Sequence, residues 1–257
     1  MGGADSDATR RDLPRRAQFL VGLGSTPLTE TMSAVALILA SASASRARLL
    51  TSAGIAFRQI NSDVEEDAVA ASLPGEPPAA IALALARAKC EAVADTLAPG
   101  PDSLAPGAAE SAEPPVLVLG CDSILEFDGR AWGKPGSPEA ATERWRRQRG
   151  GRGTLLTGHW LLDTATHRAT GRTVGTEVTF VDATDQEIAD YVATGEPLWV
   201  AGAFTLEGRA GPLIAGIHGD PSNVIGLSLP ALRTMLQDLG HELRDVATHA
   251  AAGDSTP

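Results

Sequence analysis

Three short segments of the sequence carry residues suited to chemistry on a phosphorylated small molecule. The apolar run Val116–Cys121 is followed directly by the carboxylate of Asp122, and Lys134 stands between Gly and Pro further along the chain. A continuous apolar run is typical of a strand buried on both faces, which predicts Asp122 at the carboxyl edge of a sheet, where open α/β folds bind ligands. Lys134 offers a positive charge for a phosphate. Taken alone, Asp122 is more simply explained as an acid that starts a turn, and Lys134 as a solvated loop lysine. The third segment strengthens the functional interpretation of the pair.

The third segment joins a predicted strand to a predicted helix. Ser41, Ser43 and Ser45 alternate with alanines there, and Arg46 falls in the first turn of the helix. Unpaired N–H groups at a helix N-terminus attract anions, and an arginine can grip phosphate oxygens with two parallel hydrogen bonds. Neither the P-loop pattern nor a glycine-rich dinucleotide pattern is present between strand and helix. By itself, this segment fits a plain N-cap serine and a solvated arginine equally well.

Two further charged positions are ambiguous when they are considered alone. Glu66 lies in a predicted acidic loop, and two carboxylates that converge in space can hold a divalent cation that bridges phosphate oxygens. A charge-rich loop is usually a solvated surface, so Glu66 is interpreted first as structural. Lys89 interrupts the apolar surface of a long predicted helix, where a lysine is normally solvated. His159 is interpreted as a strand residue rather than as a base.

Composition limits the classes of function. The 257-residue chain carries a net charge of −11, which argues against a nucleic-acid surface, because such a surface needs a basic stripe. No apolar run reaches the roughly 18 residues that a membrane span needs. Cys90 and Cys121 lie within apolar runs, which favours reduced core thiols, and the five histidines lack a zinc-binding spacing. The N-terminal segment lacks a convincing secretory signal, so we expect a cytoplasmic protein.

Apolar periodicity and turn signals predict strands and helices in mixed order. Strands outnumber uninterrupted strand-helix-strand units, so we expect an α/β fold with a mixed central sheet flanked by helices. Strands are predicted over residues 36–41, 56–61, 116–123, 154–163, 172–181, 199–206 and 212–217. Helices are predicted over residues 43–53, 78–97, 137–148, 185–194 and 229–239.

The same pattern predicts one folded domain with three flexible parts. We expect the domain over residues 36–240, a disordered leader over residues 1–35 and a flexible tail over residues 241–257. Residues 98–115 are dominated by Pro, Ala, Gly, Ser and acids, and such a segment buries too little apolar area to order itself. It is therefore predicted to be a flexible insertion within the domain.

Together these segments resemble the Maf family of nucleoside triphosphate pyrophosphatases, over about residues 37–240. The resemblance implies a mixed-sheet α/β fold like that of the inosine triphosphate pyrophosphatases, with a cleft between two lobes. It also implies hydrolysis between the α and β phosphates, which yields a nucleoside monophosphate and inorganic diphosphate. This reaction is assisted by a divalent metal cation (Mg²⁺, Mn²⁺ or Co²⁺). The matching motifs are Ser41…Arg46, Val64–Glu66, Ala86–Lys89, Gly120–Ser123, Gly133–Pro135, Thr157–His159, Val178–Phe180, Tyr191, Gly195–Pro197, Ala201–Phe204 and Gly219–Leu227.

The resemblance assigns roles to individual residues at matching positions. Asp122 matches the family's proton acceptor, and Glu66 matches an acid that holds the metal together with Asp122. Under the resemblance, Lys89 and Glu66 are functional rather than solvated. The triphosphate-binding positions are matched by Ser41, Arg46, Lys89 and Lys134.

The sequence departs from the family at the positions that choose the nucleobase. Ser45, Ser123 and Glu207 stand where the pyrimidine-preferring branch has Arg, Thr and Gln. Glu207 agrees instead with the branch that acts on 7-methylguanosine triphosphate, which has Trp in place of Ser45. A carboxylate only accepts hydrogen bonds, so Glu207 is expected to favour bases with adjacent N–H donors, such as guanine. Trp199-Val200 also replaces an Asp-Lys pair that is often found before the Ala-Gly motif.

The expected partner is a nucleoside triphosphate substrate, with no nucleic acid and no membrane, and a homodimer is left open. Two other classes of function compete with hydrolysis. A non-catalytic nucleotide-binding regulator of cell division would use the same cleft, but the presence of Asp122, Lys89 and Lys134 argues against it. A phosphotransferase is disfavoured because the P-loop is missing.

Overall fold

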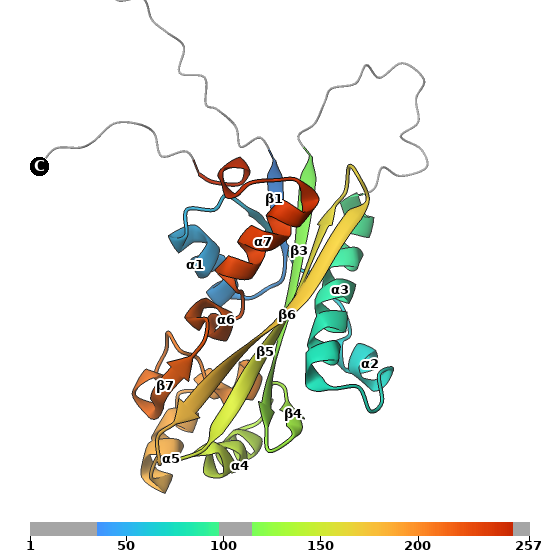
Figure 1. Cartoon of the computed structure of the whole chain (residues 1–257). Coiled ribbons are helices and arrows are strands. Elements are labelled where there is room, and N and C mark those ends of the chain that lie inside the picture. Colours follow the sequence, from blue (N-terminus) through green and yellow to red (C-terminus); the bar gives the residue numbers. More distant parts are fainter. Residues whose placement is uncertain (1–34, 98–114, 249–257) are drawn as a thin grey trace, which may run out of the picture. The chain divides into compact units, whose positions relative to one another are not determined.

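The computed structural model describes residues 35–97 and 115–248. Its strands are β1 (Ala36–Ala40), β2 (Arg58–Ile60), β3 (Val116–Phe127), β4 (Arg130–Trp132), β5 (Arg152–Asp163), β6 (Arg168–Phe180) and β7 (Ile214–His218). Within the described residues they form a seven-stranded sheet in the order β2-β1-β3-β5-β6-β7, with β4 paired to β3 (Figure 1). The pairings among β2, β1 and β3 are parallel and the others antiparallel, which confirms the predicted mixed sheet.

Helices cover both faces of the sheet (Figure 1). Helix α3 (Pro78–Leu97) packs on one face, and α1 (Ala44–Ser52) and α7 (Leu229–Leu239) pack on the other. Alternate residues of β3 point to opposite faces, so Val118 packs with α3 while Leu119 packs with α7. This explains why β3 is apolar without alternation. The remaining helices are α2 (Glu66–Ala71), α4 (Pro138–Gln148), α5 (Asp185–Ala193) and α6 (Pro221–Ile225).

Helix boundaries agree with the capping signals in the sequence. The side chains of Ser43, Ser137 and Ser228 accept hydrogen bonds from backbone N–H groups in the first turns of α1, α4 and α7. Thr184 and Glu187 form a capping box at the start of α5. The five predicted helices are confirmed to within one residue at each end.

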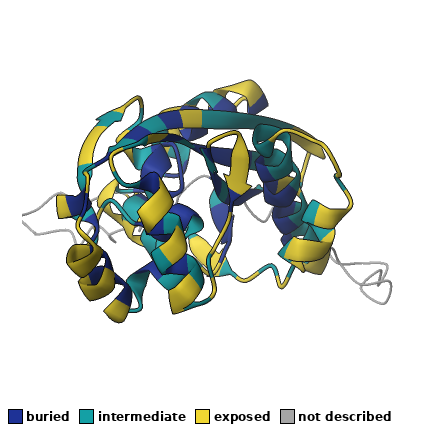
Figure 2. Cartoon of the chain, turned by 90° about the horizontal axis from the view of Figure 1, so that it is seen from below, coloured by how far each residue is buried: buried dark blue, intermediate teal, exposed yellow. Residues whose placement is uncertain are grey.

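The helices present one buried stripe to the sheet and leave the outer side exposed (Figure 2). In α7 the buried positions recur every three or four residues, as expected for an amphipathic helix. No helix in the described part of the chain combines the length and apolar character needed to cross a membrane. The buried residues of α7 are Ala231, Leu232, Met235, Leu236 and Leu239.

Two glycines let α3 lie directly against the sheet. A Cβ atom built on Gly120 of β3 would fall 2.0 Å from the backbone oxygen of Ala86, and one on Gly158 of β5 would fall 2.3 Å from that of Ala82. Neither position has room for a side chain. Backbone-to-backbone contact therefore sets the separation between this helix and the centre of the sheet.

Two hydrophobic clusters divide the domain along β3. Cys121 belongs to a cluster with α1 and α7, whereas Leu125 belongs to an aromatic-rich cluster with α4 and α5. Asp122 and Ser123 lie on the strand between the two clusters.

The predicted strand over residues 199–206 is wrong. Two short 3-10 helices, η2 (Glu196–Trp199) and η3 (Ala201–Ala203), occupy this part of the chain. Gly195 and Gly202 have φ angles of +75° and +68°, which turn the backbone away from an extended path. We call residues 195–210 the corner segment.

Three further predictions are corrected. Asp122 does not end its strand, because β3 leaves β1 at Gly120 but continues along β5 as far as Glu126. Glu66 begins α2 instead of lying in a loop. Residues 241–248 pack against the domain rather than forming a tail, with Val246 fully buried. The predicted leader (apart from residue 35), insertion (apart from residue 115) and remaining tail lie outside the described residues.

Candidate active site

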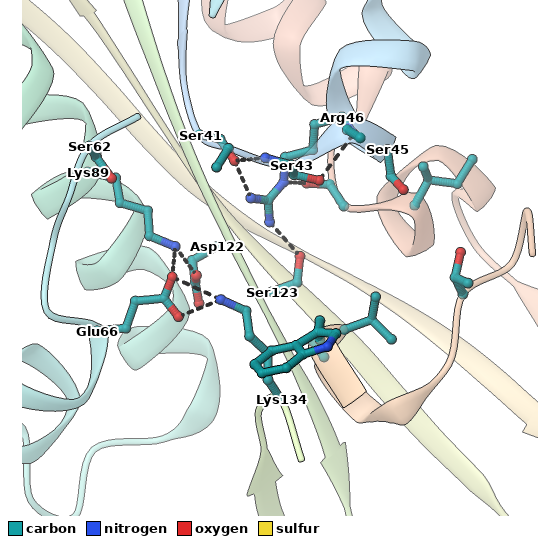
Figure 3. Close-up of a pocket in the computed structure, with 18 of the residues that line it drawn as sticks. Ser41, Ser43, Ser45, Arg46, Ser62, Glu66, Lys89, Asp122, Ser123 and Lys134 are labelled. Atoms are coloured by element: carbon teal, nitrogen blue, oxygen red, sulfur yellow. Dashed lines mark hydrogen bonds and ion pairs between the residues drawn. The ribbon is translucent and has the colours of Figure 1, made fainter. Parts of the chain in front are cut away.

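A cavity of about 620 Å³ is lined by the β1–α1 junction, by parts of α3 and β3, and by the corner segment (Figure 3). Glu207, one of the nine site residues predicted from the sequence, is not among the described residues that line it. The cavity gathers the other eight, although they come from five separate stretches of the chain. These residues are Ser41, Ser45, Arg46, Glu66, Lys89, Asp122, Ser123 and Lys134.

Two carboxylates and two ammonium groups form the charged cluster: Glu66, Lys89, Asp122 and Lys134 (Figure 3). Lys89 Nζ donates to Asp122 Oδ1 at 2.5 Å and lies 2.7 Å from Glu66 Oε1. Lys134 Nζ donates to Glu66 Oε2 at 2.9 Å. The side chains of Lys89 and Asp122 are only 8% and 10% exposed, so their pairing is shielded from water.

The close contact between α3 and the sheet explains why Lys89 meets Asp122. Lys89 lies one helical turn beyond Ala86, and Asp122 lies two residues beyond Gly120 on the same face of β3. Since Ala86 and Gly120 touch through their backbones, the two charged side chains project into the same space.

Opposing effects act on the Glu66 carboxyl group. Burial alone would raise its pKa, but hydrogen bonds and positive charge from Lys89 and Lys134 outweigh burial and lower the pKa to about 2. Glu66 is therefore ionised at neutral pH.

Arg46 is buried, and uncharged oxygens hold its guanidinium group (Figure 3). Nε donates to the carbonyl oxygen of Gly226 at 2.7 Å, Nη1 to Ser41 Oγ at 3.0 Å, and Nη2 to Ser123 Oγ at 3.1 Å. Within the described residues, no ion pair neutralises this group. A buried charge without a charged partner is costly, so the cavity beside Arg46 favours an anion.

Ser123 is tied into the wall of the cavity. Besides accepting from Arg46, its Oγ lies 3.0 Å from Thr157 Oγ1, which donates to the carbonyl oxygen of Asn223. The Asn223 amide in turn donates to the carbonyl oxygen of Leu155 at 3.1 Å. Asn223 lies in α6, and its contacts brace β5, the strand that pairs with β3 beside Ser123.

Arg48 connects two of the predicted specificity positions. Its Nη2 donates to Glu207 Oε1 at 2.6 Å and to Ser45 Oγ at 3.1 Å. The Glu207 carboxylate therefore already has a charged donor on one oxygen. Sequence analysis missed Arg48 because the contact with Glu207 joins residues 159 positions apart. The available signal was the spacing of three between Ser45 and Arg48, which places both on one side of a helix.

Trp199 is the second residue that sequence analysis left without a role. It lines the cavity, and 70% of its surface is exposed. The available signal was the replacement of a charged pair by Trp199-Val200 just before the Ala-Gly motif. An exposed indole group at a ligand cavity offers a flat apolar face that water solvates poorly.

The lysine content was a further signal in the sequence. Of the 21 lysine and arginine residues in the chain, only Lys89 and Lys134 are lysines. Both line the cavity. In a chain that otherwise uses arginine for positive charge, the two positions with a compact ammonium group stand out.

Glu66 and Asp122 supply the oxygen atoms best placed to hold a divalent cation. Both carboxylates converge on Lys89, and Asp122 Oδ2 has no hydrogen-bond partner within the described part of the chain. No group of three His, Cys, Asp or Glu side chains among residues 35–97 and 115–248 is arranged to hold a metal. Two carboxylates fit an ion such as Mg²⁺, which takes its other ligands from phosphate oxygens and water.

His159 and the two cysteines are structural, as the sequence interpretation has them. Burial lowers the pKa of His159 to about 4, and its Nε2 accepts from the backbone N–H of Ser228 at 2.9 Å. Burial raises the pKa of Cys90 to about 12 and that of Cys121 to about 11, so neither thiol is ionised at neutral pH.

Comparison with known proteins places this cavity in a family. The family model described as Maf-like protein matches residues 36–239, which include every element that lines the cavity. A protein named nucleoside triphosphate pyrophosphatase from Streptomyces coelicolor is 51% identical over 79% of this chain and 90% of its own length. Proteins of the same name from Salinispora tropica and Thermosynechococcus vestitus are 43% and 44% identical, over 85% and 82% of this chain and 92% and 98% of their lengths.

Among solved structures, a nucleoside-triphosphatase / dITP/XTP pyrophosphatase from Mycobacterium abscessus is 13% identical to this chain. The superposition has a TM-score of 0.30 and covers 58% of this chain and 75% of that one. The implied likeness to the inosine triphosphate pyrophosphatases stays a prediction.

Proposed function

Because the chain belongs to the Maf-like protein family, we propose that it is a nucleoside triphosphate pyrophosphatase that cleaves between the α and β phosphates. The products are a nucleoside monophosphate and inorganic diphosphate. The name shared by relatives with 43–51% identity supports this proposal. Of the structural observations, the cavity where buried Arg46 meets the charged cluster carries it.

That cavity suits a triphosphate for a specific electrostatic reason. Arg46 brings a positive charge that no carboxylate of the described residues neutralises, while Lys134 holds a half-exposed ammonium group at the charged cluster. Both groups line the same cavity, and a triphosphate carries enough negative charge to interact with each of them. The three hydrogen bonds that hold Arg46 fix its direction before the substrate arrives, which reduces the cost of ordering it.

Asp122 acts as the general base in this proposal. It accepts a proton from a water molecule while the water oxygen bonds to the α phosphorus, and the bridging oxygen leaves with diphosphate. Lys89, at 2.5 Å from Asp122 Oδ1, fixes the carboxylate so that Oδ2 faces the water. Arg46 and Lys134 stabilise the charge that develops on the phosphate oxygens.

Glu66 and Asp122 would hold the divalent cation, with Mg²⁺, Mn²⁺ and Co²⁺ as the candidate ions. When bound, the ion supplies charge neutralisation at the phosphates and lowers the pKa of a bound water. Chelation with EDTA should abolish turnover, and titration of each ion into the metal-free chain should identify those that restore it. Full activity in EDTA after dialysis would contradict this part of the proposal.

The test of the reaction is hydrolysis in water enriched in ¹⁸O, followed by separation of the products and measurement of the molecular mass of each. Attack at the α phosphorus places ¹⁸O in the nucleoside monophosphate, whereas attack at the β phosphorus places it in diphosphate. A phosphotransferase would need an acceptor and would leave the label out of both products. A non-catalytic regulator would bind the nucleotide without turnover, so either result would overturn the proposal.

A further inference from the structure

The cavity has a charged cluster on one side and a corner segment with a different chemistry on another. The corner segment contributes Trp199, Val200, Phe204 and Thr205 to the lining, and none of these side chains carries a charge. A nucleotide has the same division, with a charged triphosphate and a flat, largely uncharged base. The charged cluster and Arg46 account for the triphosphate, and Glu207 is a candidate for the edge of the base, which leaves the flat face of the base without a described partner.

Trp199 is the residue of the corner segment best suited to a flat ligand. With 70% of its surface exposed, it is the most exposed large hydrophobic residue of the described chain. Leu243 is the other such residue, at 41%, and it does not line the cavity. Single exposed apolar residues are common and need no explanation, but a Trp at the ligand cavity offers a large π face where the base must lie.

The backbone around Trp199 is held firmly, so its exposure does not reflect a loose segment. The Glu196 carboxylate accepts hydrogen bonds from the backbone N–H groups of Arg209 at 2.9 Å and Ala210 at 3.4 Å. The hydroxyl group of Tyr191 donates to the same carboxylate at 3.0 Å. These contacts close the corner segment on itself around the exposed Trp199.

The corner segment is also attached to the loop that carries Lys134. The backbone N–H of Gly136 donates to the carbonyl oxygen of Leu198 at 3.0 Å, and that of Gly202 donates to Gly133 at 3.2 Å. Lys134 lies between Gly133 and Gly136, and Trp199 lies between Leu198 and Gly202. The two backbone hydrogen bonds therefore join the two segments on both sides of these residues. The backbone of Trp199 is therefore held beside the loop that carries Lys134, and both side chains line the same cavity.

We propose that Trp199 is the platform on which the nucleobase stacks when the triphosphate is held by Lys134 and Arg46. This inference rests on the proposed function, since it requires a nucleotide substrate. Stacking uses the π face that every base has, so Trp199 contributes affinity for all bases and leaves their discrimination to other groups.

The experiment compares two ligands that differ only in whether they carry a nucleoside. An α,β-methylene nucleoside triphosphate and inorganic tripolyphosphate are titrated by calorimetry into the wild-type chain, Trp199→Ala and Trp199→Phe. Trp199→Ala should weaken binding of the nucleotide by about 5- to 100-fold, which is the usual worth of one aromatic stack. Its affinity for tripolyphosphate should stay within about twofold of wild type, and Trp199→Phe should retain most nucleotide affinity.

Tryptophan fluorescence provides a second readout and Leu243→Ala a matched control. Nucleotide binding should quench the wild-type emission, tripolyphosphate should not, and Trp199→Phe should lose the quenching although the other tryptophans remain. Leu243→Ala should behave as wild type in every measurement. Unchanged nucleotide affinity in Trp199→Ala, or equal losses for both ligands, would overturn the inference.

The same measurements separate this inference from the proposed function. A wild-type chain that binds nucleotide through Trp199 but does not hydrolyse the α–β bond would overturn the proposed function alone. A chain that hydrolyses the bond while Trp199→Ala binds nucleotide normally would overturn the stacking role alone.

Discussion

The charged cluster and the corner segment line one cavity but are built by opposite means. In the charged cluster, Lys89 and Asp122 are 8% and 10% exposed and project from a helix and a strand in direct backbone contact. In the corner segment, Trp199 is 70% exposed and lies at the end of the short 3-10 helix η2. Groups that must keep a fixed distance from a reacting atom are best carried by packed elements, whereas contacts to a variable ligand suit an exposed loop.

This difference separates the reaction from the choice of substrate. A change in the corner segment or at the Arg48–Glu207 pair leaves the packing of α3 on β3 untouched. We therefore expect variants of the charged cluster to lose turnover for every nucleotide. Variants of the Arg48–Glu207 pair should reorder the nucleotides while keeping turnover, whereas variants of Trp199 should weaken the binding of every nucleotide.

The largest expected effect is that of Asp122→Asn. Loss of the general base should lower kcat by about two to four orders of magnitude for every nucleotide, because amide groups do not accept a proton from water. Steady-state kinetics measures the effect, and circular dichroism checks the fold. Asp128→Asn, in the exposed turn after the same strand, is the matched control and should keep normal kcat. Near-normal turnover in well-folded Asp122→Asn would remove Asp122 from the mechanism.

Lys134→Ala should show the next largest effect, on binding. Loss of a charge-assisted contact should weaken triphosphate binding about ten- to a hundredfold and change binding of the monophosphate much less, since the monophosphate lacks the β and γ phosphates. Calorimetry with both ligands checks this. Lys134 is 51% exposed, so its removal spares the fold better than that of Arg46. Arg130→Ala, nearby on β4 but outside the cavity lining, is the control, and equal losses for both ligands would refute the assignment.

The Arg48–Glu207 pair should change the ranking of bases by a smaller factor. Glu207→Gln should shift preference from GTP toward UTP and dTTP by roughly tenfold in kcat/KM, because an amide offers a donor to a pyrimidine carbonyl. Arg48→Ala frees the carboxylate and should shift preference the other way. Arg87→Ala, which breaks an exposed pair with Glu91, is the control. An unchanged ranking in both variants would show that neither residue of the pair reads the base.

The smallest expected effect concerns stability at acid pH. The pKa of Glu66 is about 2 in the folded chain, below its ordinary value of 4.5. The stabilisation from its ionised form is therefore complete above about pH 4.5 and is lost as pH falls toward 2. Because Glu66 is 36% exposed, solvent screening reduces the contribution to about 1 kcal/mol. Glu66→Gln should flatten the dependence of the unfolding free energy on pH in this window, and an unchanged slope would contradict it.

The buried half of the molecule could be predicted from the sequence because local signals and burial point the same way there. The caps at Ser43 and Ser137 and the apolar stripe of α7 indicate helices without reference to the rest of the chain. The apolar run before Asp122 indicates a central strand. Its continuation toward Phe127 was missed, because the partners in β5 lie 28 to 32 positions away, from Ile124↔Leu156 to Glu126↔Thr154.

The exposed half of the cavity could not be predicted in the same way. Residues 199–206 have the composition of a strand, but Gly202 and Ala203 within this range have positive φ angles, as does Gly195 just before it. The pair between Arg48 and Glu207 leaves no local trace in the sequence. The family resemblance identified Glu207, because a motif can be matched position by position. It did not identify Arg48, because the contact between the two side chains depends on the tertiary fold.

The contact between α3 and the sheet at Gly120 and Gly158 has a consequence for how this protein can change over generations. In most helix–sheet contacts, exchange of a core side chain alters the spacing of the two layers, because interiors are close-packed. Here the layers touch through backbone atoms, so neighbouring core residues can drift in volume without moving Lys89 relative to Asp122. Core residues around the site can therefore be substituted, whereas Gly120 and Gly158 accept no side chain.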